Sequence, residues 1–211
     1  MTNWKRKENL KEIIENIRNQ SVPIEIFLWN NNPEDLEDYS VDLQINSSKN
    51  LMCLPRWFMA NYANSEYVFS LDDDLCFNDS KVVEDCIKYS LKPNQALGAF
   101  GVKLRDNLDY WSSRHICCYP DKDRQVNIIK GRFFFIKKSL LKNVSMLPSE
   151  DADINKPRIE DDIFISHYLE QAYLPSFLSK RFKELPEGGQ SLYRDSNHRE
   201  SRKTQTKKYF K

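Results

Sequence analysis

The chain has 211 residues, of which 40% are hydrophobic and 12% aromatic, with a formal net charge of +1 at pH 7. This length suits a single domain with a sizeable core, and the composition is typical of a globular protein. A net charge so close to zero argues against a general nucleic-acid-binding protein. Only five glycines are present, and neither a Walker motif nor a GxGxxG pattern occurs, so no glycine-rich phosphate loop is available.

The cysteines and the apolar segments bear on the compartment of the protein. The five cysteines contain no CxxC pair, and the adjacent Cys117 and Cys118 are expected to be reduced packing residues rather than a disulfide. No signal peptide and no apolar run of about 18 residues is recognisable. The sequence therefore predicts a soluble, cytoplasmic protein without a membrane span.

The first hundred residues alternate between helical and strand patterns. Apolar residues recur between residues 8 and 20 at the spacing of an amphipathic helix. The further elements expected are strands over 24–29, 41–45 and 67–71, a short helix over 54–63, a helix over 81–91 and a strand over 96–102. This alternation predicts an α/β fold, a single domain with a mostly parallel central sheet flanked by helices.

The second half is more irregular. Residues 103–125 are polar and contain Tyr110 and Trp111, which are either binding residues on an exposed loop or part of the core. Two strands are expected over 126–129 and 132–136. The glycine between them, Gly131, permits a bulge or the close approach of a ligand.

The strand at 67–71 runs directly into three acids, Asp72, Asp73 and Asp74. Adjacent carboxylates repel one another, and a cation placed between them stabilises their ionised forms. If the extended chain continues, Asp72 and Asp74 point the same way and Asp73 points the other way. Such oxygen ligands suit Mg²⁺ or Mn²⁺, which usually keep positions open for substrate phosphates. A solvated acidic turn is the alternative explanation.

Two further charged segments lie near the C-terminus. Asp161 and Asp162 open a helical pattern, where acids either favour the helix dipole or take part in a site. Residues 194–211 contain seven Lys or Arg against two acids, and a pair of glycines ahead of them supplies a hinge. This basic segment is either a solvated end or a cover for an anionic ligand.

Taken together, these segments resemble nucleotide-sugar-dependent glycosyltransferases of the GT-A type. The similarity is nearest to the exostosin-like branch and to small glycosyltransferases encoded by large DNA viruses of algae. It rests on residues 2–6, 29–31 and 56–58, on 71–74 as the DxD motif, on 161–163 in place of the usual Glu-Asp-Ile, and on His198 with its neighbouring arginines. Only three residues precede Trp4, whereas the family begins with a full strand, which indicates an internal start or a trimmed first strand.

The resemblance implies a metal-dependent hexosyltransferase. It would move a sugar from a UDP-sugar, with UDP-glucose expected first, to a glycan or glycoprotein acceptor, using Mn²⁺ or Mg²⁺ as cofactor and no nucleic-acid partner. Residues 1–102 would then form the half that binds the nucleotide sugar, and residues 103–193 the half that binds the acceptor and carries catalysis. Residues 194–211 would form the basic C-terminal segment.

The same resemblance assigns roles to individual residues. The metal would be held by Asp74, Asp72 and His198. Catalysis would fall to Asp162 or Asp161, because the acids at 160–162 fit the family motif in two registers. The residues expected around the nucleotide sugar are Thr2, Asn3, Arg6, Asn30, Arg56, Asp72, Asp73, Arg199 and Arg202. Tyr110 and Trp111 are expected to bind the acceptor.

Two other classes of protein share part of this pattern. A sugar-nucleotide nucleotidyltransferase would use a similar sheet and metal, but it requires a glycine-rich phosphate loop that this chain lacks. A non-catalytic module that binds a cation or a carbohydrate would use the acidic cluster, but it would not need Asp161, Asp162 or the basic segment. The enzymatic interpretation requires that Asp161 and Asp162 lie beside Asp72 and Asp74 in the folded chain.

Overall fold

The computed structural model describes residues 1–89, 91–92, 94–117, 121–144, 160–189 and 196–211. The strands are β1 (Thr2–Asn3), β2 (Phe27–Asn30), β3 (Leu43–Asn46), β4 (Tyr67–Leu71), β5 (Leu75–Phe77), β6 (Gln95–Gly98), β7 (Gly101–Lys103), β8 (Arg114–Ile116), β9 (Arg124–Val126), β10 (Ile128–Ile129), β11 (Phe133–Lys137), β12 (Gln171–Leu174) and β13 (Phe182–Glu184). The helices are α1 (Lys7–Arg18), α2 (Pro55–Ala60), α3 (Val82–Lys88), α4 (Leu141–Val144), α5 (Asp161–His167) and α6 (Ser196–Tyr209), with 3-10 turns at Lys138–Leu140 and Ser176–Leu178. The first two residues of the predicted basic segment, 194 and 195, lie outside the described residues.

The elements with the clearest hydrophobic patterns form where the sequence predicts them. In α1, Leu10, Ile13 and Ile17 are buried on the face that the pattern selects, and β4 has the predicted bounds, Tyr67–Leu71. The predicted strand 96–102 is instead divided into β6 and β7. The division falls at Gly98, where an added Cβ would lie 2.3 Å from Cγ2 of Ile129. The Ile129 side chain packs so closely against the Gly98 backbone that a larger residue would require it to move.

The described strands form four small sheets. Strands β1, β2 and β3 pair in parallel, and the largest sheet has the order β4-β11-β6-β12-β9. Strands β4 and β6 run in the same direction, as the alternation predicts, but β11 inserts between them in the antiparallel direction. The α/β class is therefore confirmed, while the largest sheet is mixed rather than mostly parallel. Hydrophobic periodicity does not report strand direction, because side chains alternate in both arrangements.

The core is organised on both faces of β11. Phe133 and Phe135 face one buried cluster, which contains Leu71, Leu97 and residues of α1 and α3. Phe134 faces a second cluster, which contains Trp57 and residues of α5. All three phenylalanines have 0% exposure, so β11 is covered on both faces. Burial of this kind explains its continuous apolar sequence.

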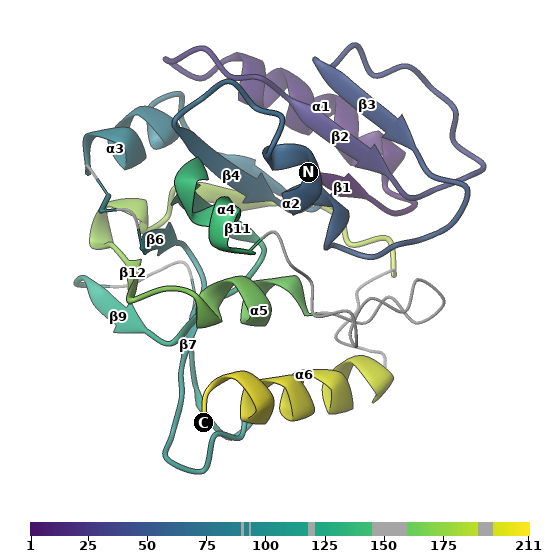
Figure 1. The fold of residues 1–211 in the computed structure, drawn as a ribbon. Coiled ribbons are helices and arrows are strands. Elements are labelled where there is room, and N and C mark those ends of the chain that lie inside the picture. The colour runs from purple at the N-terminus through teal and green to yellow at the C-terminus, as the bar shows by residue number, and fades with distance from the viewer. Residues whose placement is uncertain (90, 93, 118–120, 145–159, 190–195) are drawn as a thin grey trace.

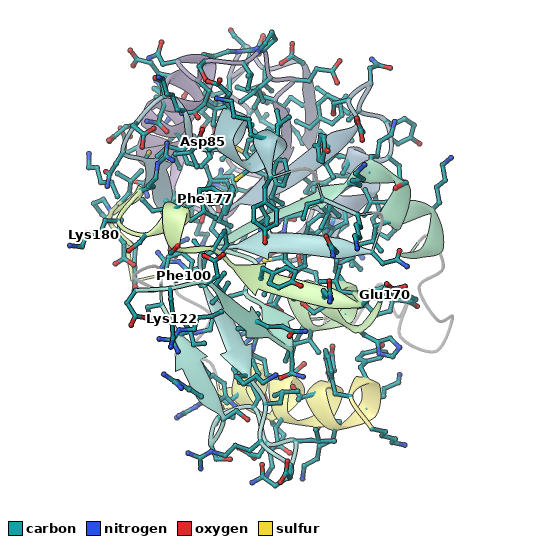
Figure 2. All side chains as sticks on the ribbon, turned by 90° about the vertical axis from the view of Figure 1, so that its left-hand side faces the viewer. Asp85, Phe100, Lys122, Glu170, Phe177 and Lys180 are labelled. Carbon is teal, nitrogen blue, oxygen red and sulfur yellow. The ribbon has the colours of Figure 1, made fainter. Side chains whose placement is uncertain are left out.

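The arrangement in space brings together elements from distant parts of the chain, as where β13 pairs with β5. Helix α1 and strands β1–β3 occupy the top of the view in Figure 1, the β4–β11 sheet lies in the middle, and α6 lies at the bottom beside α5. Figure 2, turned by 90°, shows the same order, with α6 again at the base. Among the described residues no helix has the length and apolar character needed to cross a bilayer, and the four described cysteines are free.

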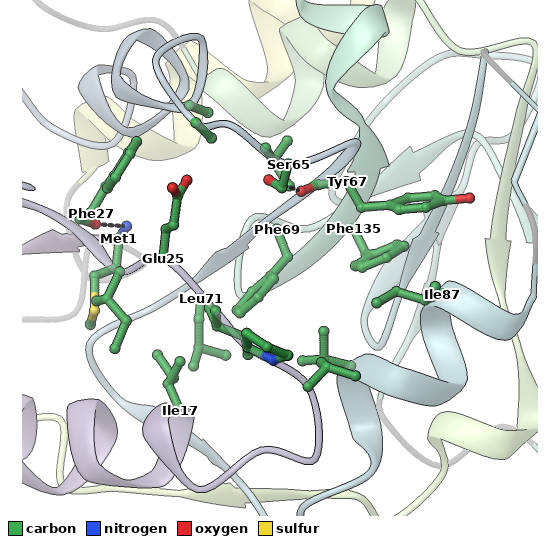
Figure 3. A pocket seen from close by; sticks show the side chains of 18 of the residues that line it. Met1, Ile17, Glu25, Phe27, Ser65, Tyr67, Phe69, Leu71, Ile87 and Phe135 are labelled. Atoms are coloured by element: carbon green, nitrogen blue, oxygen red, sulfur yellow. Dashed lines mark hydrogen bonds between the residues drawn. The ribbon is translucent and has the colours of Figure 1, made fainter. Parts of the chain in front are cut away.

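An apolar cavity of about 410 Å³ lies between the N-terminal elements and β4. Its lining includes Ile17, Leu71 and Phe135, and Figure 3 shows these side chains around the hollow. The backbone nitrogen of Met1 donates to the carbonyl oxygen of Phe27 at 2.7 Å at its edge. The few polar groups in this lining make it unlike the polar cavity that holds most of the predicted site residues.

Candidate functional site

The three acids occupy the tight turn between β4 and β5. Because β4 ends at Leu71, the expected alternation of Asp72, Asp73 and Asp74 is wrong. Asp73 accepts hydrogen bonds from the backbone of Trp4, at 2.9 Å, and from Arg6. Oδ2 of Asp74 lies 3.3 Å from Nη1 of the same Arg6. Asp73 and Asp74 therefore share one guanidinium, and Asp72 is turned toward a different one.

The partner of Asp72 is Arg56, from α2. Nη1 of Arg56 lies 2.7 Å from Oδ1 of Asp72. Its Nε and Nη2 both lie 2.8 Å from Oδ2 of Asp161, at the start of α5. The indole nitrogen of Trp57 donates to the same oxygen at 2.7 Å. The acidic turn and the second acidic pair are thus joined through one buried guanidinium.

Asp162 is held from the other side by the C-terminal helix. Nη2 of Arg202, in α6, lies 2.7 Å from Oδ2 of Asp162, and Nη1 lies 3.0 Å from Glu160. The backbone nitrogen of Gly131 donates to Asp162 at 3.3 Å. An added Cβ on Gly131 would lie 2.2 Å from Nη2 of Arg56. The close approach that Gly131 permits is therefore made by the Arg56 side chain of the protein itself.

These groups surround one polar cavity of about 400 Å³. The predicted site residues in its lining are Thr2, Arg6, Arg56, Asp72, Asp73, Asp74, Tyr110, Trp111, Asp161, Asp162, His198 and Arg202. They come from both terminal parts of the chain, from the β4–β5 turn, from α2, from α5 and from the loop between β7 and β8. The requirement set by the sequence, that the two acidic clusters lie side by side, is met.

Three predicted residues are not in the lining of this cavity. Asn3 donates to Oδ1 of Asn30 at 3.0 Å, and Asn30 donates to the backbone oxygen of Asp35 at 2.6 Å. Both asparagines have 0% exposure, so they fix the ends of β1 and β2. The guanidinium of Arg199 lies 5.0 Å from the ring of Trp111.

The predicted exposed aromatic pair is packed against α6. Tyr110 is only 3% exposed, and the guanidinium of Arg202 lies 4.3 Å from its ring. The indole nitrogen of Trp111 donates to the backbone oxygen of Arg199 at 2.9 Å. Of the two alternatives that the sequence leaves open, Tyr110 follows the packed one, because the basic segment folds back as a helix over this loop. Both residues still line the cavity.

The two acidic clusters have shifted proton affinities. Burial raises the pKa of Asp73 to about 6, against the opposing charge of Arg6. Burial and the neighbouring charge of Asp72 raise the pKa of Asp74. Burial likewise raises the pKa of Asp161. For Asp162 burial acts in the same direction, but Arg202 outweighs it and holds the pKa below its usual value.

The sequence analysis missed several residues of the cavity wall. Lys130, Arg132, His115 and Asn31 line the cavity. Nη2 of Arg132 lies 3.4 Å from Oδ1 of Asp74, and Nη1 lies 2.6 Å from Glu184. The two basic residues flank Gly131, so the glycine between two strands was the signal in the sequence. Periodicity gives such connecting residues no weight.

A divalent metal fits the chemistry of the acidic turn. No group of three or more His, Cys, Asp or Glu side chains in the described ranges is arranged to hold a metal. Magnesium-type ions, however, are commonly held by one or two carboxylates together with substrate phosphates. Asp72 and Asp74 are close enough for their mutual repulsion to raise the pKa of Asp74, a cost that a cation would remove. His198, the third predicted ligand, lies 3.0 Å from Glu160 through Nδ1.

Comparison with known proteins identifies the fold. No family model and no curated protein matches the chain. Among solved structures, it is similar to the mannosyltransferase PcManGT from Pyrobaculum calidifontis, in complex with GDP-Man and Mn²⁺, with a TM-score of 0.52 and 14% identity over 79% of this chain. It is also similar to S. aureus TarS residues 1–349, in complex with UDP-GlcNAc, with a TM-score of 0.59 and 15% identity over 95% of this chain.

The chain spans 48% of the length of the first structure and 62% of the second. At such identities the similarity shows a common fold, and both proteins that share it are in complex with a nucleotide sugar. The expected glycosyltransferase fold is therefore confirmed. The exostosin-like branch stays a prediction.

Proposed function

We propose that the protein is a metal-dependent glycosyltransferase that takes its sugar from a nucleotide diphosphate donor. The observation that carries the proposal is the double contact of Arg56, whose guanidinium lies 2.7 Å from Asp72 and 2.8 Å from Asp161 in the wall of one cavity. The fold, shared with two solved glycosyltransferases, supports the same conclusion. UDP-glucose is the first donor to test, and the proposed acceptor is a glycan or a glycoprotein.

The acidic turn is the proposed diphosphate site. Asp72 and Asp74 would hold a divalent ion, Mn²⁺ or Mg²⁺, which supplies Lewis-acid stabilisation of the charge on the departing diphosphate. Arg132, which lies 3.4 Å from Asp74 and pairs with Glu184, would add fixed positive charge from the same cavity lining. Arg6, which Asp73 and Asp74 share, holds the turn to the start of the chain. Thr2 and Asn31, also in the lining, would border the nucleoside.

Asp162 and Asp161 would then have separate tasks. Oδ2 of Asp161 already accepts hydrogen bonds from Arg56 and Trp57, so this carboxylate positions α5 against α2. Asp162 is ionised, because Arg202 lowers its pKa, and it lies beside the Gly131 backbone in the same wall. We assign to Asp162 the role of the carboxylate at the reacting centre, either as the base for the acceptor hydroxyl or as the anion facing the sugar. Asp161 is a positioning residue.

The test is donor hydrolysis with a panel of nucleotide sugars, with and without Mn²⁺, alongside the thermal midpoint of the protein. We expect one donor, first of all UDP-glucose, to be hydrolysed slowly in the presence of metal and to raise the midpoint. Asp74→Ala should abolish both effects. The matched control is Asp121→Ala, because Asp121 is exposed and pairs only with Arg124 among the described residues.

Two results would decide against the transferase. A metal-dependent shift that no nucleotide sugar changes would favour a non-catalytic cation-binding module. Equal hydrolysis by Asp74→Ala and the unchanged protein would remove the acidic turn from the mechanism. The control variant carries the same Asp-to-Ala substitution at an exposed position. A loss seen in Asp74→Ala alone therefore reflects the acidic turn.

A further inference from the structure

The wall of the polar cavity contains a lysine, Lys130, whose ammonium forms no ion pair with the described residues. Lys130 follows β10 and is fixed by its backbone nitrogen, which donates to the carbonyl oxygen of Phe100 at 2.8 Å. Its side chain is half-buried and lines the cavity. No hydrogen bond or ion pair joins its ammonium to any residue in the described part of the chain. A charge withdrawn from water and left unpaired is costly unless a ligand supplies the partner.

A second donor in the same wall also lacks an acceptor. Arg202 is 7% exposed, and its two terminal nitrogens are bound to Glu160 and Asp162. Its Nε has no acceptor within the described ranges. An unsatisfied buried donor typically costs about 1–3 kcal/mol, and more for a charged group. This nitrogen is itself buried, so Arg202 adds positive charge to the wall rather than an open contact for a ligand.

Several positively charged side chains surround Lys130 and Arg202. Burial lowers the pKa of Lys130, and the charges of Arg202 and Arg132 act in the same direction. Burial also lowers the pKa of His115, together with the charges of Lys130 and Arg202. The carboxylate whose charge acts on Lys130, Asp162, already accepts a hydrogen bond from Arg202 at 2.7 Å. This part of the wall therefore favours a negatively charged group.

The negatively charged group bound at Lys130 would be separate from the diphosphate of the nucleotide sugar. No hydrogen bond or ion pair in the described structure joins Lys130 to Asp72, Asp73 or Asp74. Asp162 is instead the carboxylate whose charge acts on Lys130, and Arg202, which binds Asp162, packs against the Tyr110 ring. An anion at Lys130 would therefore be next to the carboxylate assigned to the reacting centre, where the acceptor must enter.

We propose that Lys130, with the positive charge of Arg202 behind it, forms an oxyanion subsite, and that the acceptor is a carbohydrate that carries a phosphate or carboxylate group. This inference rests on the proposed transferase function and narrows its substrate class. Lysine and arginine both bind such groups through charge-assisted hydrogen bonds. The subsite would position the acceptor hydroxyl beside Asp162 by holding the anion a short distance away.

The probes are glucose 6-phosphate and glucose, a pair that differs in one phosphate. Both are titrated into the protein with Mg²⁺ and saturating UDP, and binding is followed by calorimetry and by the thermal midpoint. We expect glucose 6-phosphate to bind at least about ten-fold more tightly, the effect of one charge-assisted hydrogen bond. Lys130→Met should remove the difference and Lys130→Arg should retain part of it. The control is Lys122→Met, an exposed lysine in Figure 2.

Three outcomes would overturn the assignment. Equal binding of the two sugars to the unchanged protein would show that no oxyanion subsite exists. A loss of UDP affinity in Lys130→Met as large as the loss for glucose 6-phosphate would place Lys130 in the diphosphate site. If Lys130→Met weakened the binding of UDP-glucuronate more than that of UDP-glucose, the anion would belong to the donor sugar.

The outcomes also separate this inference from the proposed function. If UDP with Mg²⁺ produces no shift at all, the transferase proposal fails. The difference between glucose 6-phosphate and glucose can still be measured without UDP, so the subsite stands or falls on its own result.

Discussion

Nε and Nη2 of Arg56 both lie 2.8 Å from Oδ2 of Asp161, although 105 residues separate the two in the chain. The two side chains are only 3% and 7% exposed. In such a buried pair each charge is tolerated because the other is present. The third nitrogen of the same guanidinium holds Asp72, so one arginine sets the distance between the two acidic clusters.

Removal of this arginine should damage stability and activity together. Arg56→Met leaves Asp161 buried without its cation, and we expect a loss of about 3–5 kcal/mol in the free energy of unfolding. Donor hydrolysis should fall to background, because Asp72 and Asp161 lose their common anchor. Urea unfolding and the hydrolysis assay measure the two effects.

The control for Arg56→Met is Arg124→Met, which breaks a surface pair with Asp121. Exposed pairs contribute about 0–1 kcal/mol, so this variant should unfold almost as the original protein does. A cost for Arg56→Met no larger than for Arg124→Met would contradict the role given to the buried bridge.

A substitution at Gly131 tests whether stability and hydrolysis depend on the position of the Arg56 guanidinium as well as on its presence. In Gly131→Ala the new methyl group would lie 2.2 Å from Nη2 of Arg56. The guanidinium cannot move freely, since it is bound to Asp72 and Asp161, so we expect a loss of about 1–3 kcal/mol in unfolding free energy. Hydrolysis should fall much more than binding of UDP, and a titration of UDP alongside the activity assay separates the two.

The comparison for that variant is Gly189→Ala. An alanine at Gly189 meets nothing within 4 Å, and its only cost is the positive φ of +74°. We expect about 1 kcal/mol from that strain and unchanged UDP binding. If both alanine variants behave alike, steric pressure on Arg56 is not the cause.

The two acids at the start of α5 should respond differently to neutralisation. Asp162→Asn should lower donor turnover by about 10²–10⁴-fold, the usual contribution of a positioned acid or base, with little change in UDP affinity. Asp161→Asn should lower stability and turnover together, because its carboxylate anchors Arg56 and Trp57. Full turnover in Asp162→Asn, with loss in Asp161→Asn alone, would reverse the assignment.

The acidic turn should make stability depend on pH. The pKa of Asp73 is about 6 in the folded protein, against about 4 for an unfolded aspartate. Between these values the folded state binds more protons, so the free energy of unfolding falls as pH rises, by up to about 1.4 kcal/mol per pH unit. The contribution is fully present below pH 4 and is lost by the time the pH has passed 6. Urea unfolding of the protein and of Asp73→Asn across this window should show a shallower slope in the variant, in which the raised pKa values of Asp74 and Asp161 still contribute.

Much of the fold could be predicted from local pattern. The apolar run before Asp72 predicted β4 with its bounds, and the spacing of Leu10, Ile13 and Ile17 predicted α1. Strand direction in the largest sheet could not be predicted, because β11 is apolar on both faces and either direction would bury it. The helical form of the basic segment was also missed, since α6 has only two buried residues, Arg202 and Thr206.

For the site, the sequence by itself determined which residue types are present: three acids at a strand end, a second acidic pair and a basic C-terminal segment. Only the tertiary structure decided their pairing, because Arg56 meets Asp161 and Arg202 meets Asp162 across distant parts of the chain. Lys130 and Arg132 gained their importance in the same way, from a cavity wall assembled by elements that are not neighbours in sequence. Local composition fixes the charges, whereas the distances between them, and so their chemistry, depend on the packing of the whole chain.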